Sequence, residues 1–242
     1  MIQFGIDKFF LGKYTLATYA IGDIHGNLTC LTAILKSINP NKSDTVIFLG
    51  DYIDRGLFSS QVIETIISLK SQTNVITLRG NHEVMMLSSK YDYDCFNQWM
   101  GYGGFDTVAS YEGDYNHKSW HRQVPNSHWR FLENTIPFFE NEKFIFVHAS
   151  VEGEKEMGEQ SNEYLYWKSF DSISAPKSGK RVICGHTSQK DGEIKSNNFA
   201  ICIDTWSLMM WLTCLNVDTF EYINANVQGE TKIGNYEFKL YE

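Results

Sequence analysis

The sequence predicts an α/β fold, because strand-like and helix-like apolar patterns alternate over its first 90 residues. Short apolar runs predict strands at residues 14–21, 45–49 and 75–78, and each run leads into a Gly followed by Asp or Asn. Strands that alternate with helices in this way favour a parallel sheet with right-handed crossovers. Ligand sites in such sheets collect beyond the carboxyl ends of the strands.

The helices between these strands follow from apolar residues at helical spacing. They are expected at residues 28–38, at residues 62–69 and from His82 onward. The first should end at Asn39-Pro40, because proline cannot continue a helix. Ser59 and Ser60 precede the apolar positions of the second helix and are candidates for its N-cap.

The second half of the chain is richer in strand patterns. Apolar runs predict strands at residues 144–147, 181–184 and 200–203, followed by a closing hairpin at residues 209–217 and 220–223. A second sheet packed on the first is therefore expected, in one domain spanning residues 1–242. Residues 91–142 hold many aromatic side chains and no ligand cluster, so they are either helices that pack into the core or a helical cap over a site.

The composition limits the classes of function. The chain has 242 residues and a net charge of −8, and its Lys and Arg residues form no stripe, which argues against nucleic-acid binding. The longest apolar stretch, near residues 206–215, is broken by Ser207 and Thr213, so no membrane span is expected. Residues 1–13 do not resemble a secretory leader, and five cysteines without a C-x-x-C pair favour a reducing cytoplasm.

Three motifs indicate the chemistry. GDIHG (22–26), GDYIDRG (50–56) and GNHE (80–83) follow the three predicted strands. They bring carboxylate, imidazole and carboxamide groups to one sheet edge, a mixture that suits Mn, Fe or Zn ions. Arg55 and Arg79 lie beside these groups, where their positive charges would balance the negative charge of a bound phosphate. The pattern predicts phosphoester hydrolysis at a two-metal centre.

These motifs, in this order, resemble those of the phosphoprotein phosphatase (PPP) family of calcineurin-like metallophosphoesterases. The segments YAIGDIHGN, GNHEVMM, GYGGFDTVASY, FVHAS and CGHT are similar to those of its small bacterial and phage lambda-type members. The resemblance covers roughly residues 14–224. It implies a metallophosphoesterase-like sandwich of two mixed β-sheets flanked by helices, with the metals at the sheet edge.

The resemblance also assigns roles. It implies two divalent ions, with manganese as the first expectation and iron or zinc as alternatives; a hydroxide that bridges them would attack the phosphate. Asp51 would bind both ions, and the full ligand set would be Asp23, His25, Asp51, Asn81, His148 and His186. His82, paired with Asp54, would be the general acid, and Arg55 and Arg79 would bind the phosphate.

Single residues support less than the pattern does. An isolated His148 or His186 would more often be structural, and only the combined motifs favour a metal role. Glu83 is expected to complement the N-terminus of its helix rather than bind metal. Three further histidines have no motif around them and are expected at the surface or in the cap: His117, His121 and His128.

The chain departs from the family pattern at two places. Ser169 stands where the family usually carries a third phosphate-binding arginine, and Trp206 replaces the glycine of D-T-G. Lys168 is one position away and should point to the opposite face if the segment is extended. We therefore expect weaker phosphate binding than in relatives that retain the arginine.

The expected function is hydrolysis of phosphomonoesters, first of all phosphoserine and phosphothreonine in proteins, by a cytoplasmic, metal-dependent phosphatase. The substrate would be a phosphorylated protein or a small phosphoester, with no nucleic-acid or membrane partner. Symmetrical hydrolysis of diadenosine tetraphosphate is one alternative. A phosphate-binding module with weak catalysis is the other, because of the missing arginine at Ser169.

Overall fold

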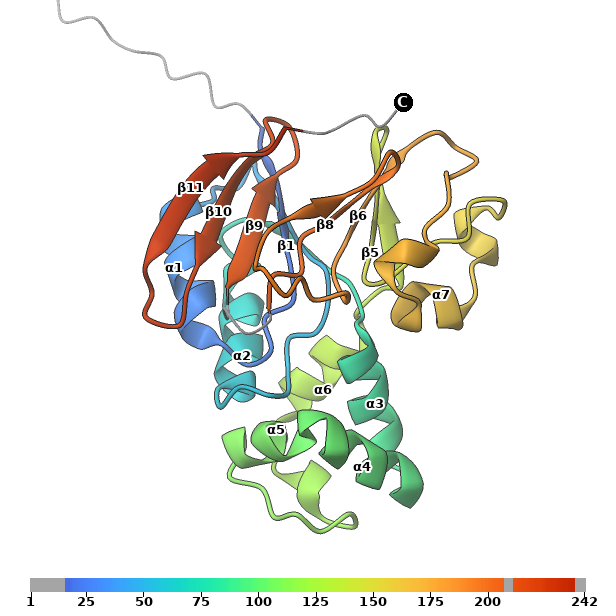
Figure 1. Cartoon of the computed structure of the whole chain (residues 1–242). Helices are drawn as coiled ribbons and strands as arrows, with labels where there is room; N and C mark the ends of the chain where they lie inside the picture. The colour runs from blue at the N-terminus through green and yellow to red at the C-terminus, as the bar shows by residue number, and fades with distance from the viewer. Residues whose placement is uncertain (1–15, 207–210, 238–242) are drawn as a thin grey trace, which may run out of the picture.

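A computed structural model describes residues 16–206 and 211–237. Two mixed β-sheets pack against each other, helices flank them, and a helical lobe extends from one end (Figure 1). The predicted α/β fold with two mixed sheets is thus confirmed. None of the helices within these residues is long and apolar enough to cross a membrane.

The first sheet has the strand order β11-β10-β9-β1-β2-β3. Its strands are β1 (Thr18–Ile21), β2 (Thr45–Phe48), β3 (Asn74–Thr77), β9 (Leu212–Asn216), β10 (Glu221–Ala225) and β11 (Thr231–Asn235). The first three are parallel, as predicted, with Ala20 opposite Ile47. The predicted hairpin of β9 and β10 is confirmed, although residues 209–210 of its first strand lie outside the described residues. Strand β11 has no counterpart in the sequence prediction.

The second sheet has the order β4-β5-β6-β8-β7. Its strands are β4 (Phe138–Glu140), β5 (Phe144–Val147), β6 (Arg181–Cys184), β7 (Lys195–Ser196) and β8 (Ala200–Cys202). Strands β5, β6 and β8 are parallel, and β4 and β7 add antiparallel edges. The carboxyl ends of β5 and β6 lie near those of β1 and β3, because His148 after β5 lies 2.9 Å from Asn81 after β3, and His186 after β6 donates its backbone N–H to Asp23 after β1.

The two sheets meet in an apolar layer. Ile47 and Leu49 of the first sheet pack in one buried cluster with Phe146, Ile183 and Ile201 of the second. Burying one such side chain contributes roughly 1.5–3 kcal/mol. This layer fixes the relative position of the two sheets, and so of the loops that follow their strands.

Helices α1 (Leu28–Ile38) and α2 (Ser59–Leu69) pack on the other face of the first sheet. The Asn27 side chain caps α1, and the helix ends as predicted at Asn39, which has a left-handed φ of 40°. The predicted serine cap of α2 is wrong. Ser59 lies within the helix, and its Oγ accepts the backbone N–H of Asp54, because the chain enters α2 from the turn of the second motif.

The helical lobe follows the third strand. It contains α3 (Asn81–Ser89), α4 (Tyr93–Trp99), a π-helical turn η1 (Met100–Gly104), α5 (Phe105–Ser110), a 3-10 turn η2 (Trp120–Arg122) and α6 (Asn126–Glu133). Trp99, Trp120 and Trp129 are buried and pack in the core as predicted, whereas Tyr102 and Phe105 of the same segment are exposed. Whether it also caps substrate stays a prediction.

The structure decides between the two predicted places of one histidine, the surface or the helical segment of residues 91–142. His128 is buried within the helical lobe. Its two ring nitrogens contact the Tyr111 hydroxyl at 2.8 Å and the Glu64 carboxylate at 3.0 Å, and these partners satisfy a polar group that would otherwise be costly to bury. His128 therefore joins α2, α5 and α6.

The segment after β5 packs on the outer face of the second sheet. It contains a 3-10 turn η3 (Met157–Glu159), helix α7 (Asn162–Trp167) and a second 3-10 turn η4 (Phe170–Ser172). Leu165 and Phe170 join the apolar cluster beneath β5, β6 and β8. Both the α7 end and η4 approach the loop that follows β6.

Candidate metal centre

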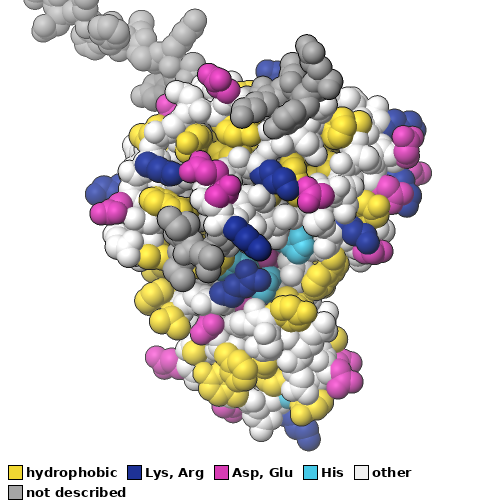
Figure 2. All heavy atoms as spheres, viewed as in Figure 1, with side chains coloured by type: hydrophobic (Ala, Val, Ile, Leu, Met, Phe, Trp, Pro, Cys, Tyr) yellow, Lys and Arg dark blue, Asp and Glu magenta, His cyan; other side chains and the backbone are white. Residues whose placement is uncertain are grey.

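The six predicted ligands come together at the seam between the two sheets. Asp23 and His25 follow β1, Asp51 follows β2, and Asn81 follows β3. His148 follows β5, and His186 follows β6. All are buried except His186, which is half-buried. On this face, histidine side chains gather between the sheets and the lobe, with basic side chains beside them (Figure 2).

The backbone at this seam is unusual. His25, Asp51 and His186 have positive φ values of 46°, 51° and 63°, and Asp54 and Arg55 have 72° and 65°. Non-glycine residues seldom adopt this left-handed region, and they persist there when surrounding contacts hold them. The concentration of such residues here sets this region apart as a functional site.

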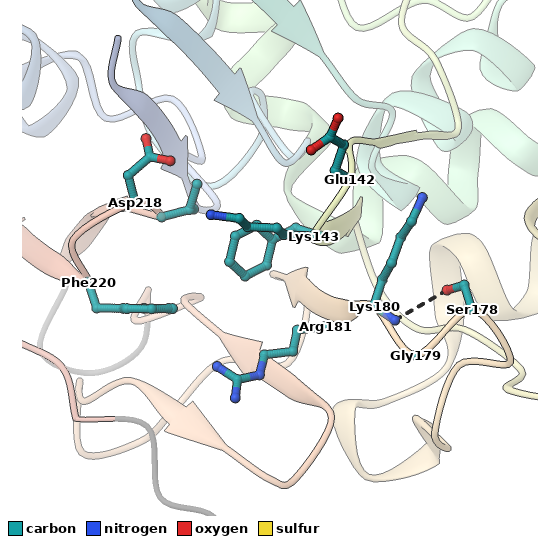
Figure 3. A pocket seen from close by; sticks show the side chains of 10 residues that line it. Glu142, Lys143, Ser178, Gly179, Lys180, Arg181, Asp218 and Phe220 are labelled. Atoms are coloured by element: carbon teal, nitrogen blue, oxygen red, sulfur yellow. Dashed lines mark hydrogen bonds between the residues drawn. The ribbon is translucent and has the colours of Figure 1, made fainter. Parts of the chain in front are cut away.

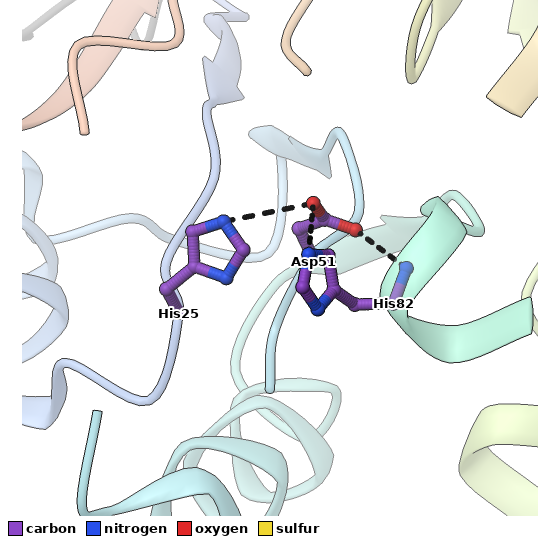
Figure 4. Close-up of side chains that lie close together, drawn as sticks. All are labelled: His25, Asp51 and His82. Atoms are coloured by element: carbon purple, nitrogen blue, oxygen red, sulfur yellow. Dashed lines mark hydrogen bonds and ion pairs between the residues drawn. The ribbon is translucent and has the colours of Figure 1, made fainter. Parts of the chain in front are cut away.

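Asp51 is the shared acid of the cluster. Its Oδ2 lies 3.6 Å from Nε2 of His25 and 3.9 Å from Nε2 of His82, and both rings point toward it (Figure 4). Its Oδ1 lies 3.5 Å from Nε2 of His148. Among the described residues, two groups of three His and Asp side chains could hold a cation, and Asp51 belongs to both: one with His25 and His82 and one with His148 and His186.

Asn81 completes the second group. Its Oδ1 lies 2.9 Å from Nε2 of His148 and 3.1 Å from Nδ1 of His186. A carboxamide oxygen between two imidazole nitrogens offers an additional neutral oxygen ligand at the same point.

Each of the three predicted histidine ligands is oriented by a backbone carbonyl. The Nδ1 atoms of His25 and His148 lie 3.0 Å from the carbonyls of Ile53 and Leu49, and Nε2 of His186 lies 3.1 Å from that of Trp167. A ring N–H that donates outward leaves the inward nitrogen with a lone pair, which is the arrangement metal-binding histidines adopt.

Burial acts in the same direction. It lowers the pKa of His148 to about 4 and also lowers the pKa values of His25 and His186. These rings are therefore neutral at pH 7, as ligation requires.

Asp23 lies among other acids. Its carboxylate accepts the backbone N–H of His186 at 3.1 and 3.2 Å, and burial together with Asp204 and Asp51 raises its pKa. Burial also raises the pKa of Asp204 to about 7. Three buried carboxyl groups with neutral imidazoles around them form a donor set that fits divalent cations.

His82 has the partner that the resemblance implied. Its Nδ1 lies 2.6 Å from Oδ2 of Asp54, which is fully buried. Burial would lower the pKa of His82, but the carboxylates of Asp51 and Asp54 outweigh it and raise that pKa. An imidazole held by a carboxylate and favoured in its protonated form can act as a proton donor.

The two predicted phosphate arginines differ in their surroundings. Arg55 is exposed, and its guanidinium lies 3.0 Å from Nε2 of His25 and 3.2 Å from Nε2 of His82. Arg79 donates from Nε to Thr135 Oγ1 and from Nη2 to the carbonyls of Glu133 and Thr135. Its Nη1 is the guanidinium nitrogen with no hydrogen bond to any described residue.

The departures from the family pattern lie beside the site. Ser169 is exposed, between Trp167, whose carbonyl contacts His186, and Phe170, whose N–H donates to Thr187 Oγ1 at 2.8 Å. The Lys168 ammonium pairs with Glu163 at 2.6 Å, as expected of a residue that faces away. The Trp206 ring lies 6.2 Å from that of His25, centroid to centroid.

Sequence reasoning missed two residues of this region. Trp99 and Thr107, from the helical lobe, both donate hydrogen bonds to the carboxylate of Asp54. Thr107 lies in the segment GYGGFDTVASY, which carried part of the resemblance, but nothing in its local pattern indicated a partner 53 residues away.

Comparison with known proteins assigns the family. The family model for calcineurin-like phosphoesterases matches residues 16–226. The chain belongs to the calcineurin-like phosphoesterase family. The predicted membership is therefore confirmed, and the family accounts for a dinuclear centre built from the histidine and aspartate groups described above.

Curated relatives of this phosphoesterase include serine/threonine phosphatases. It is 36% identical over 98 residues to the PP2A-like phosphatase PPG1 of Saccharomyces cerevisiae, a match that covers 39% of this chain and 26% of that protein. It is 30% identical over 88 residues to the catalytic subunit of serine/threonine-protein phosphatase 6 of Drosophila melanogaster, covering 35% and 29%. These relatives are consistent with the PPP family, but each match spans only about a quarter of the relative's length.

Solved structures share the fold of this phosphoesterase. A provisionally assigned diadenosine tetraphosphatase superimposes with a TM-score of 0.62 at 14% identity, covering 93% of this chain and 96% of the other. A cold-active protein tyrosine phosphatase superimposes with a TM-score of 0.59 at 16% identity, covering 90% of this chain and 78% of the other. A serine/threonine phosphatase of Saccharomyces cerevisiae has a TM-score of 0.54 at 12% identity, covering 94% of this chain and 81% of the other.

A cavity at the other end of the second sheet is separate from this centre. It measures about 390 Å³ and lies where β5 and β6 begin, lined by Lys143, Lys180 and Arg181 as well as by Glu142 and Asp218 (Figure 3). Lys180 pairs with Glu140 at 2.7 Å. Because the predicted ligands follow the opposite ends of these strands, the cavity takes no part in the metal centre.

Proposed function

We propose that this phosphoesterase is a metal-dependent phosphatase that hydrolyses phosphomonoesters, first of all phosphoserine and phosphothreonine in proteins. The observation that carries the proposal is the pair of His82 and Asp54, at 2.6 Å, beside the shared acid Asp51. A module that only bound phosphate would need no buried proton donor next to its metal ligands. The part-length relatives named as serine/threonine phosphatases support the same substrate class.

The predicted ligands would hold two divalent ions, with manganese as the first expectation and iron or zinc as alternatives. These ions, when bound, would lower the pKa of the attacking water and neutralise phosphate charge. The ligands proposed for them are the six residues Asp23, His25, Asp51, Asn81, His148 and His186. Oxygen and imidazole donors without thiolate match that choice of metals.

Two other groups would act directly on the substrate. Arg55, exposed and directed at the cluster, would bind the phosphate through its fork of N–H donors. His82 would give a proton to the leaving alkoxide, because Asp54 holds its Nδ1 and leaves Nε2 facing the centre. Arg79 would also bind the phosphate, through Nη1, because its Nε and Nη2 already donate to residues of the loop after α6.

The test is a comparison of substrates and variants. Purified protein with Mn²⁺ should hydrolyse a phosphoserine peptide and p-nitrophenyl phosphate. His82→Asn should keep its metal content, measured by elemental analysis, and lose about 10²–10⁴-fold in kcat for the peptide. His117→Asn, in the lobe away from the centre, is the matched control. Near-normal turnover by His82→Asn would remove His82 from the mechanism.

The same assay decides between the alternatives. Faster turnover of diadenosine tetraphosphate than of the phosphopeptide would favour the dinucleotide, an activity consistent with the structural neighbour at a TM-score of 0.62. Binding of inorganic phosphate without turnover of any of the three substrates would favour a binding module. Elemental analysis of protein made without added ions would identify the native metal.

A further inference from the structure

The helical lobe reaches the proposed general acid through the carboxylate of Asp54. Oδ2 of Asp54 accepts the indole N–H of Trp99 at 2.8 Å and contacts Nδ1 of His82 at 2.6 Å. Oδ1 accepts the hydroxyl of Thr107 at 2.6 Å. Each carboxylate oxygen is therefore bound by a side chain of the lobe.

Thr107 also holds the backbone of the same residue. Its Oγ1 accepts the N–H of Asp54 at 2.8 Å, while it donates to the carboxylate of Asp54. Ser59 Oγ lies 3.1 Å from both the Asp54 nitrogen and Thr107 Oγ1. Asp54 has a left-handed φ of 72°, so these bonds stabilise a conformation that aspartate seldom adopts.

The direction of the Trp99 indole is fixed by its packing. Trp99 is fully buried, and its ring lies 4.8 Å from that of Trp120 and 6.5 Å from that of Phe96. A Cβ added at Gly104 would lie 2.7 Å from the Trp99 ring, so the π-helical turn approaches it as closely as a glycine allows. The indole N–H is thus presented to Asp54 by the core of the lobe.

The lobe also contacts the neighbouring arginine. The carbonyl of Gly103 accepts the N–H of Arg55 at 3.4 Å, and a Cβ at Gly103 would lie 2.9 Å from that nitrogen. Gly103 has a φ of +110°, which favours glycine. Residues 99–107 therefore hold the whole turn that carries Asp54 and Arg55.

We propose that Trp99 and Thr107 are positioning residues for proton donation by His82, an inference that rests on the proposed function. A carboxylate fixed at one oxygen alone can rotate about its Cβ–Cγ bond and release the imidazole. Two donors, one on each oxygen, prevent this rotation and keep the His82 ring aimed at the leaving group. The lobe would thereby affect catalysis indirectly, by orienting His82 through Asp54.

The kinetic test uses the leaving group as its probe. p-Nitrophenolate departs without a proton, whereas the alkoxide of phosphoserine requires one. Thr107→Val, which keeps the shape of the side chain and removes its hydroxyl, should lower kcat for a phosphoserine peptide about 10–100-fold, a smaller loss than the roughly 10²–10⁴-fold that a general acid supplies. We expect kcat for p-nitrophenyl phosphate, and KM for both substrates, to change by less than about threefold. Thr107→Ser should restore peptide turnover.

Trp99→Phe removes only the indole donor and should produce the same selective loss. Because this residue lies in the lobe core, thermal unfolding is measured alongside, and Thr107→Val provides the same information if Trp99→Phe fails to fold. The double variant His82→Asn/Thr107→Val should lose no more than His82→Asn, since both changes act on one proton transfer. A readout independent of turnover is the downfield NMR resonance of the His82 Nδ1–H, which should shift or vanish in Thr107→Val.

The outcomes separate the two proposals. If the unmodified protein with Mn²⁺ hydrolyses no phosphoserine peptide, the proposed function fails. If it does and His82→Asn leaves that turnover intact, His82 is not the proton donor, and the positioning role is overturned while the function stands. If His82→Asn loses turnover but Thr107→Val and Trp99→Phe lose none, or lose it equally for both substrates, the positioning role is overturned while the function stands. An unchanged His82 resonance in Thr107→Val would also overturn it.

Discussion

The carboxylate of Glu83 accepts the backbone N–H of Asp51 at 2.8 Å, across 32 residues of sequence. It also accepts the N–H groups of Tyr52 at 2.9 Å and Gly80 at 2.8 Å, and it is fully buried. The bond to Gly80 is the predicted role of Glu83 at the N-terminus of its helix. The other two bonds join the second motif to the third, and so place Asp51 relative to Asn81.

Glu83→Gln should therefore lower the stability of the fold. A glutamine offers one acceptor oxygen and turns an N–H toward the other backbone donors, so we expect the free energy of unfolding to fall by about 2–3 kcal/mol. Urea denaturation measures it. Glu221→Gln, on the exposed side of β10, is the control and should change it by less than about 0.5 kcal/mol. Equal effects would show that the buried bonds of Glu83 are not stabilising.

Ser169→Arg should strengthen phosphate binding. The segment that carries Ser169 is held against the His186 loop at Trp167 and Phe170, so an arginine there can reach the centre. We expect KM for p-nitrophenyl phosphate to fall by up to about fivefold, the size of one ion pair at an exposed site. Ser178→Arg adds the same charge at the remote cavity and should leave KM unchanged. An unchanged or raised KM in Ser169→Arg would contradict the idea.

Trp206→Gly should change the preference for leaving groups. The Trp206 ring stands beside His25, where it can contact a flat leaving group. Its loss should raise KM for p-nitrophenyl phosphate by about 3–10-fold, as expected for one aromatic contact, with a smaller effect on a phosphoserine peptide. Trp206→Phe keeps an aromatic ring, so its KM for p-nitrophenyl phosphate should lie between those of the unmodified protein and Trp206→Gly. A similar change for both substrates would argue against this contact.

The native protein should expose one reactive thiol. Cys95 is half-buried, whereas the other four cysteines are buried, and burial raises the pKa of Cys30 to about 12 and the pKa of Cys214 as well. Titration with a chromogenic disulfide at pH 8 should count about one thiol in the native protein and five in urea. Cys95→Ser should remove the native reaction. Rapid modification of more than one thiol would contradict the buried placement.

The sequence predicted best what is written locally. Asp23, Asp51 and Asn81 each follow an apolar strand, so their placement at one sheet edge needs only the rule for parallel strands. The two distant histidines of the set, His148 and His186, were reached through the family resemblance, since each alone resembles a structural residue.

What the sequence did not reveal depends on partners distant in the chain. Thr107 and Trp99 meet Asp54 across 53 and 45 residues, and no periodicity records such a pair. His128 can be buried because its ring nitrogens contact Glu64 and Tyr111. The residues next to His128 in the sequence do not indicate these partners. Strand β11 has a weakly apolar, exposed pattern, and only its pairing with β10 reveals it.

The seam between the sheets also has a consequence for the order of folding. The N–H of His186 reaches the carboxylate of Asp23 across 163 residues, one of the longest loops that the site must close. Contacts of such high sequence separation form late, because the entropy of loop closure must be overcome before they contribute. A chain still emerging from the ribosome could form β1 to β3 and their helices early. It would complete the cation cage only after β6 has been synthesised and docked.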